Sequence, residues 1–212
     1  MYIPDTLNEI TLAQYQKYIK YQKDNDDENF LAIKMIEVFC GLRNHTVRSM
    51  KAKSIRDICK ILTDMFNEKP QLVKQFEMKG ITYGFVPDLE NITFGEYIDL
   101  DTFIGDFENM HKAMAVLYRP ITQSYKDKYT IEKYTGDKYE DMINMPMDAV
   151  FSSILFFYHL GMELSTVMMN SLETQEEENL VQYLSSIESG DGINQFGVYL
   201  DKMLQDLKIS LN

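Results

Sequence analysis

The sequence predicts a mostly α fold: a helical domain with a small β-hairpin near residues 76–87 and two degenerate capped-helix repeats. Apolar residues recur every three or four positions along most of the chain, which is the period of an amphipathic helix. Glycine and proline number only 10 and 5 in 212 residues, whereas an all-β protein needs many of them in its turns. The 45% hydrophobic content is enough to fill a core, which excludes a wholly disordered chain.

One local pattern occurs twice and defines the two repeats. Residues 3–15 read IPDTLNEITLAQY, and residues 86–97 read VPDLENITFGEY. Both contain Thr-x-x-Gln or Thr-x-x-Glu, the capping-box pattern of a helix start. The residue pairs are Thr11 with Gln14 and Thr93 with Glu96. In a capping box the threonine hydroxyl and the Gln or Glu side chain each accept a hydrogen bond from a free backbone amide. Each copy therefore predicts an extended entry followed by a sharply started helix.

The first part of the chain predicts three helices. Periodic apolar residues mark helices at 11–23, at 29–40 and from Ser54 to just before Pro70. An acidic run separates the first two helices, and its charge is favourable just before a helix N-terminus. Gly41 follows the second helix and is a typical helix stop.

The second part predicts the hairpin and then further helices. Aromatic and β-branched residues interrupted by two glycines favour paired short strands within residues 72–87. A capped helix then starts at Thr93, and its amphipathic partner covers 106–118. Residues 122–141 are polar and tyrosine-rich, which predicts a long connector or small strands. A long core helix is expected at 147–172.

Two further helices are expected near the end of the sequence, at 177–188 and 193–208. The second of these carries an apolar stripe formed by Leu200, Met203, Leu204 and Leu207. We expect residues 1–70 to form an N-terminal helical repeat unit. Residues 71–212 would form the second repeat unit and the core-helix region, with both units packed as one domain.

The charge distribution points to protein partners. The formal net charge of −12 argues against nucleic-acid binding by the whole surface, because phosphate contacts need clustered cations. The segment from Arg43 to Lys60 has the opposite, positive charge and contains a single acid, Asp57. Its basic residues are Arg43, Arg48, Lys51, Lys53, Arg56 and Lys60. This segment is either a solvated face or a candidate partner-binding surface for an acidic neighbour, including a second copy of the chain.

The core helix at 147–172 predicts association, because apolar residues surround most of its circumference. One chain of this size does not necessarily cover all of them, so we expect a homo-oligomer or a place in a larger assembly. Phe151, Phe156 and Tyr158 are the residues expected near that contact. Acidic residues and a histidine interrupt the most apolar stretch, which argues against a membrane span.

The sequence contains no recognisable pattern for catalysis or metal binding. His45, His111 and His159 are scattered, and Cys40 and Cys59 do not combine with His45 at zinc-site spacing. A glycine-rich phosphate loop and a nucleophile-elbow motif are both absent. We therefore expect no enzyme activity and no cofactor, with an enzyme whose site is unrecognised as the alternative. Two cysteines cannot build a disulfide framework, which favours a reducing cytoplasm.

Three segments resemble proteins of tailed bacteriophages. They read LxxITFGEYIDLDTFI at 89–104, NMHKAMAVLYRPI at 109–121 and MPMDAVFSSILFFYHLGMEL at 145–164. These segments are similar to small acidic virion or assembly proteins, especially those of crAss-like phages and other phages of gut Bacteroidetes. The resemblance covers residues from about 83 to 165, and the N-terminal repeat is a looser match.

This resemblance implies a non-enzymatic virion structural protein, either a capsid cargo protein or a component of the tail or of a ring. Its partners would be other phage structural proteins. Its location would be the bacterial host cytoplasm during assembly and then the virion. The same resemblance leaves a second role open, that of a tail-assembly chaperone absent from the mature virion. It transfers no catalytic, cofactor-binding or metal-binding residue to this chain.

The capping boxes generate a stability prediction. Thr93→Ala should lower the free energy of unfolding by about 1 kcal/mol, because it removes the side chain that caps the helix. Thr11→Ala should have a similar effect if both copies are structural. Chemical denaturation of both variants measures this. If neither variant changes stability by more than a few tenths of a kcal/mol, the capping account is wrong.

Overall fold

The computed structural model describes residues 1–89, 91–126 and 128–174. Within these residues the chain forms seven α-helices and a four-stranded antiparallel sheet with strand order β1-β2-β3-β4. The prediction of a mostly α fold with one small hairpin is therefore wrong, since the protein is mixed α/β. The predicted helices at 177–188 and 193–208, with the stripe Leu200, Met203, Leu204 and Leu207, lie outside the described residues.

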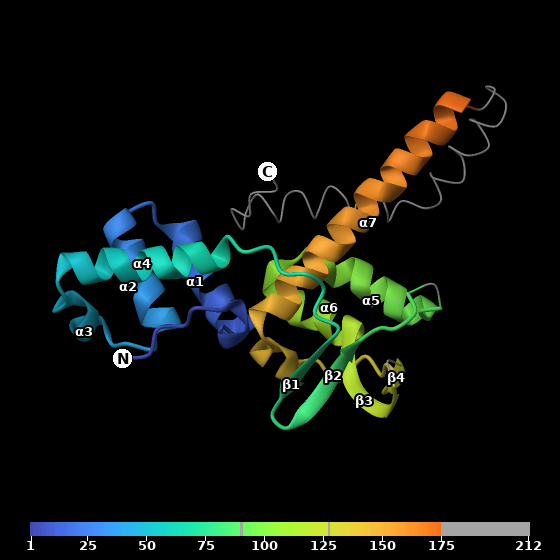
Figure 1. Cartoon of the computed structure of the whole chain (residues 1–212), viewed down its shortest axis with the longest axis horizontal. Helices are drawn as coiled ribbons and strands as arrows, with labels where there is room; N and C mark the ends of the chain where they lie inside the picture. The colour runs from blue at the N-terminus through green and yellow to red at the C-terminus, as the bar shows by residue number, and fades with distance from the viewer. Residues whose placement is uncertain (90, 127, 175–212) are drawn as a thin grey trace.

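Helices α1 to α4 gather at one end of the molecule (Figure 1). Their bounds are Leu12–Asp24 for α1, Glu28–Phe39 for α2, Asn44–Arg48 for α3 and Ala52–Phe66 for α4. Three of them lie close to the positions that apolar periodicity predicts, and α3 is an additional short helix. Asp27 caps α2 by accepting hydrogen bonds from the amides of Asn29 and Phe30, so the acidic run does begin a helix.

Both predicted capping boxes are confirmed. At the start of α1 the Gln14 amide donates to Thr11 Oγ1 over 3.2 Å, and the Thr11 amide donates to Gln14 Oε1 over 2.9 Å. Helix α5, Phe94–Ile104, starts in the same way. There the Glu96 amide donates to Thr93 Oγ1 over 3.3 Å, and the Thr93 amide donates to Glu96 Oε2 over 2.6 Å.

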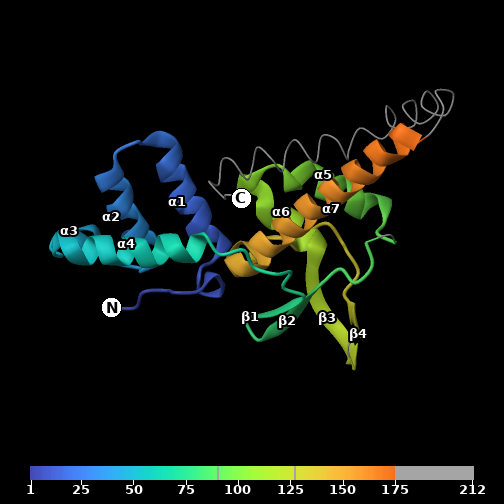
Figure 2. The ribbon, with the colours of Figure 1, turned by 45° about the horizontal axis from the view of Figure 1, so that its top comes forward.

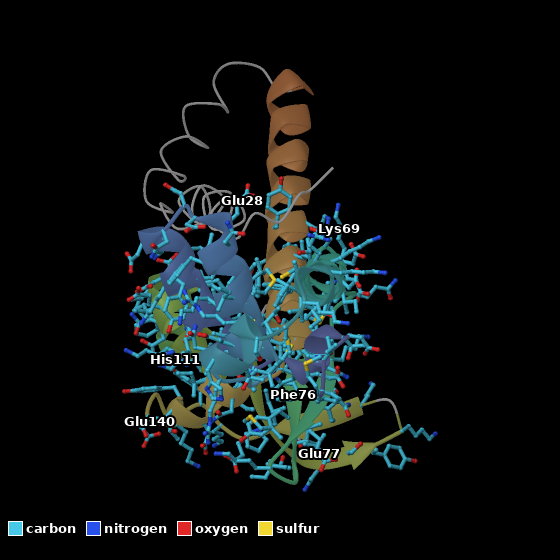
Figure 3. All side chains as sticks on the ribbon, turned by 90° about the vertical axis from the view of Figure 1, so that its left-hand side faces the viewer. Glu28, Lys69, Phe76, Glu77, His111 and Glu140 are labelled. Atoms are coloured by element: carbon cyan, nitrogen blue, oxygen red, sulfur yellow. The ribbon has the colours of Figure 1, made fainter. Side chains whose placement is uncertain are left out.

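The predicted hairpin exists, but it is only half of the sheet. Strands β1, Gln75–Met78, and β2, Ile81–Phe85, are joined by a two-residue turn in which Lys79 and Gly80 both have positive φ. Such a turn matches the twist of a two-stranded ribbon. Side chains alternate between the two faces of β1. Phe76 stacks on the ring of Tyr83, whereas the next residue, Glu77, is exposed to solvent (Figure 3).

The other half of the sheet consists of strands β3, Tyr118–Tyr125, and β4, Lys128–Ile131. The sequence predicts a helix that ends at residue 118 and leaves small strands within residues 122–141 as one of two options. Proline lacks a backbone N–H and is normally excluded from central strands. Here Pro120 lies where the pairing of β3 with β2 ends, just before a register irregularity between Ile121 and Gln123 in the pairing with β4. The strand therefore tolerates the missing donor.

The remaining helices lie against the sheet and extend from it. They are α5, already described, α6 at Met110–Leu117 and α7 at Met147–Thr174, with short 3-10 segments at Leu7–Glu9, Phe107–Asn109 and Glu140–Asn144. The α5–α6 pair forms the crossover between β2 and β3. Helix α7 begins beside the sheet and projects away from the rest of the described chain (Figure 2).

One tyrosine connects the helical end to the rest of the core. Tyr15 of α1 is only 4% exposed, and four aromatic rings surround it. Its ring centroid lies 5.2 Å from Phe66 of α4, 5.7 Å from Phe107 and 5.1 Å from Phe151 of α7, with Phe39 of α2 at 6.4 Å. Buried residues from before and after position 70 accordingly form one hydrophobic cluster.

Backbone pairing makes a second connection, between the segment before α1 and the segment before α7. The Leu12 amide donates to the Met145 carbonyl over 3.0 Å, and the Met147 amide donates to the Ile10 carbonyl over 2.9 Å. The entry into α1 and the entry into α7 therefore lie side by side as a small antiparallel bridge. The first and last described helices begin from this common point.

A polar group in the core joins the sheet to α7. Tyr118 is almost fully buried, and its hydroxyl donates to the Val73 carbonyl over 2.7 Å while accepting from Ser153 Oγ over 3.0 Å. The Val73 amide in turn donates to Ser152 Oγ over 3.1 Å. Burial raises the pKa of Tyr118 to about 12, so this hydroxyl stays protonated and continues to donate at neutral pH.

Gly84 of β2 generates a second stability prediction. A Cβ at this position would lie 2.5 Å from Cε2 of Tyr129 and 3.0 Å from Cγ1 of Ile121, because the Tyr129 ring crosses β2 there. The Tyr129 hydroxyl holds the ring in place by donating to the Phe85 carbonyl over 2.7 Å. We expect Gly84→Ala to destabilise the protein by about 2 kcal/mol in chemical denaturation, as overpacking usually does.

The matched control is Gly95→Ala in α5, where nothing lies within 4 Å of the added Cβ. That variant should be neutral or slightly more stable, since alanine favours a helix over glycine. A Gly84→Ala variant as stable as the wild type would contradict the proposed steric role of Tyr129.

Candidate functional site

The six predicted basic residues form one exposed surface, which we call the basic surface. It consists of Arg43, Arg48, Lys51, Lys53, Arg56 and Lys60, on α3, α4 and the segments just before these helices. All six side chains are exposed. None of them takes part in the ion pairs found among the described residues. The cations of this surface are therefore available to an acidic partner.

The amphipathic character of α4 orients this surface. Ile58, Leu62 and Met65 of α4 are buried in the core, which turns the opposite face of the helix toward solvent. Lys53, Arg56 and Lys60 lie on that face at positions i, i+3 and i+7, and the exposed acids Asp57 and Asp64 follow Lys53 and Lys60 by one turn. Further apolar surface accompanies the charges, because Ile61 beside Lys60 is 41% exposed.

The three apolar residues predicted near a partner contact have different surroundings. Phe151 is 1% exposed and packs edge-on against Tyr15, so the chain's own core covers it. Phe156 is half-buried against Phe85, with ring centroids 5.7 Å apart, and Tyr158 is also half-buried. The first turns of α7 are therefore covered mostly from within the chain. The structure does not join these three residues to the basic surface in one site.

Sequence reasoning missed a more exposed apolar surface on α5. Phe94, Tyr97 and Ile98 are 77%, 42% and 45% exposed, and with Asp101 they lie on one helix face. We call these four residues the α5 surface. The repeat gave no signal for this exposure, because Phe94 and Tyr97 occupy the positions of Leu12 and Tyr15, which are buried in α1.

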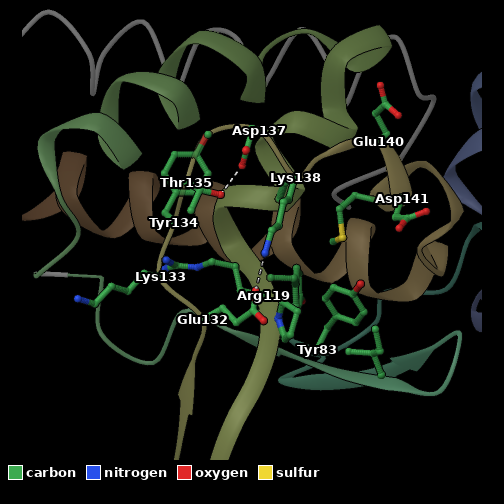
Figure 4. A pocket seen from close by; sticks show the side chains of 16 residues that line it. Tyr83, Arg119, Glu132, Lys133, Tyr134, Thr135, Asp137, Lys138, Glu140 and Asp141 are labelled. Carbon is green, nitrogen blue, oxygen red and sulfur yellow. Dashed lines mark hydrogen bonds and ion pairs between the residues drawn. The ribbon is translucent and has the colours of Figure 1, made fainter.

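The molecule also has a pocket of about 440 Å³ between β3, the loop after β4 and the 3-10 segment Glu140–Asn144 (Figure 4). Arg119 lies in its wall, and its Nη1 forms an ion pair with Glu96 Oε1 over 2.7 Å. Both side chains of this pair are largely buried. The Tyr134 hydroxyl donates to Asp99 Oδ2 over 2.7 Å, so the pocket wall is joined to α5 at two points.

Glu96 therefore has two structural roles. One carboxylate oxygen caps α5 through Thr93, and the other pairs with Arg119. Burial alone would raise the pKa of Glu96, but the hydrogen bonds from Thr93 and the charge of Arg119 outweigh it, and the net pKa is lowered. For Tyr134, burial and the hydrogen bond to Asp99 raise the pKa.

The described histidine and cysteine side chains differ in their surroundings. Among them no group of three or more His, Cys, Asp or Glu side chains could hold a metal ion. His111 lies beside Tyr139, and burial is the main cause that lowers its pKa. Cys40 and Cys59 are free and half-buried, and burial raises the pKa of both thiols, which disfavours the reactive thiolate. Among the described residues, three ion pairs involve residues that line the Arg119 pocket: Arg119 with Glu96, Lys138 with Glu132, and Asp141 with Lys79.

No helix within the described part of the chain is long and apolar enough to cross a membrane. Comparisons with protein families, with curated proteins and with solved structures found no match to this chain. The surfaces described above are therefore interpreted from their own geometry and charge.

The Glu96–Arg119 pair generates a pH-dependent prediction. Because folding lowers the pKa of Glu96, its stabilising contribution is present above the unfolded-state pKa of about 4.3 and is lost as the pH falls through the folded-state pKa. Glu96→Gln should cost about 3 kcal/mol at pH 7, since it leaves Arg119 buried without its partner. The difference from the wild type should shrink below about pH 4.

Denaturant unfolding of both proteins from pH 7 to pH 3 measures this difference. Glu140→Gln serves as the control, because Glu140 is exposed on the rim of the same pocket and forms no ion pair among the described residues. Its effect should be small at every pH. A difference for Glu96→Gln that stays constant with pH would contradict the stabilising role of the ionised carboxylate.

Proposed function

We propose that this chain is a non-enzymatic structural protein of a tailed-phage virion, a capsid cargo protein or a component of the tail or of a ring. It acts through contacts with other phage structural proteins and with copies of itself. It is present in the bacterial host cytoplasm during assembly and afterwards in the virion. The phage assignment rests on the sequence resemblance of residues 83–165.

The observation that carries the interaction role is the unpaired basic surface on an acidic chain. The protein has a formal net charge of −12, yet six cations on α3 and α4 have no acidic partner within the described residues. Solvated charge on this scale steers a partner of opposite sign and fixes its orientation. The exposed side chains of the α5 surface add apolar area to the contacts that the chain can make.

Quantitative mass spectrometry of purified phage particles tests this function. We expect the protein at a fixed copy number per particle after density-gradient purification and a high-salt wash, compared with the major capsid protein. The infected-cell lysate serves as the control for expression. Abundant protein in the lysate with none in particles would contradict the virion role and support a tail-assembly chaperone instead.

A further inference from the structure

The α5 surface is an apolar helix face without a partner among the described residues. Phe94 at 77% exposure is the most exposed large hydrophobic side chain of the described chain, and Tyr97 and Ile98 lie one turn further along the same face. The equivalent positions in α1, Leu12 and Tyr15, are 0% and 4% exposed because other helices of the chain cover them. The same capped-helix pattern is thus covered in one copy and open in the other.

Charge identifies the occupant of this face. The α5 surface carries one acid, Asp101, and α5 has no lysine or arginine, while its other acids, Glu96 and Asp99, are bonded to Arg119 and Tyr134. Asp101 is exposed on the same face as the apolar residues and forms no ion pair among the described residues. The complementary surface is basic with some apolar area, and α4 provides both through its cations and the exposed Ile61.

Two symmetric contacts are disfavoured by the same charges. A contact of the α5 surface with itself would bring Asp101 against Asp101, and a contact of the basic surface with itself would bring its six cations against each other, and both arrangements cost free energy. A contact of α5 with α4 pairs opposite signs. Figures 1 and 2 place α3 and the start of α4 at one end of the described chain and α5 toward the other. One molecule can therefore use both surfaces at once.

We propose that the α5 surface of one copy docks on the basic surface of a second copy in a head-to-tail contact. This inference deepens the proposed structural function and rests on it. Phe94 and Tyr97 pack beside Ile61 of the neighbour, and Asp101 faces the cations of the neighbour's α4. A head-to-tail contact uses two different surfaces, so repetition closes a ring or continues as a filament.

Complementation between two full-length variants tests the contact. The first variant, Phe94→Ser with Tyr97→Ser, removes the apolar α5 contacts. The second, Arg56→Glu with Lys60→Glu, reverses the charge on α4. Each alone should self-associate at least about tenfold more weakly than the wild type in analytical ultracentrifugation, as loss of a central aromatic or charged anchor predicts. An equimolar mixture should form a one-to-one dimer, because one intact pair of surfaces remains.

Matched controls distinguish the loss of this contact from the effect of changing any exposed aromatic or charged residue. Tyr125→Ser replaces another highly exposed aromatic residue, on β3, and Lys17→Glu with Lys20→Glu reverses two exposed charges on α1. Both controls should associate like the wild type. Circular dichroism and thermal unfolding should show that all variants are folded, as expected for substitutions at exposed positions.

Three results would overturn the proposal. They are a wild-type protein that stays monomeric, an α5 variant that associates like the wild type, and a mixture of the two variants that forms no dimer. Charge reversal on α4 that abolishes retention on DNA but leaves association unchanged would also overturn it, by assigning the basic surface to nucleic acid. The virion role is tested separately, since a monomer found in particles would retain that function and lose only this contact.

Discussion

The packing of aromatic rings around Tyr15 is the interaction on which the arrangement of the whole molecule depends. Its ring contacts side chains from α2, α4, α7 and the 3-10 segment before α6, so one residue fixes the position of four elements. Aromatic pairs at these distances add specific geometry to the free energy of apolar burial. The buried residues of the helices at one end and of the sheet at the other belong to the same hydrophobic cluster.

The sequence predicted those features that depend on neighbouring residues. Both capping boxes were readable, because a Thr-x-x-Gln or Thr-x-x-Glu pattern places its donors and acceptors within one turn. Strands β3 and β4 were left undecided because, within the described chain, β4 pairs only with β3, and β3 pairs on its other side with β2, which lies far away in the sequence. Residue type alone argues against Pro120 in a central strand, and its acceptability in β3 depends on where the pairing with β2 ends.

The candidate surfaces also contain features that residue type predicts and features that only the tertiary structure decides. Exposure of the six cations followed from residue type, because lysine and arginine are rarely buried without a partner. The distinction between Phe151, which is buried, and Phe94, which is exposed, could not be predicted from residue type or from helical period. Both are phenylalanines on apolar helices, and only the tertiary arrangement decides which helix face the rest of the chain covers. The repeat marked Phe94 as the equivalent of Leu12 but carried no information on its environment.

The backbone bridge between the starts of α1 and α7 has a consequence for biosynthesis. Helix α1 emerges early from the ribosome, but the groups that bond to its entry belong to Met145 and Met147, about 135 residues later. At typical translation speeds the N-terminal helices wait on the order of ten seconds for these partners. Phe39 and Phe66 are available to Tyr15 early in that interval, whereas the side of its ring that packs on Phe151 stays open to solvent and to chaperones until α7 is made. Completion of the core is thus coupled to synthesis of the last described helix.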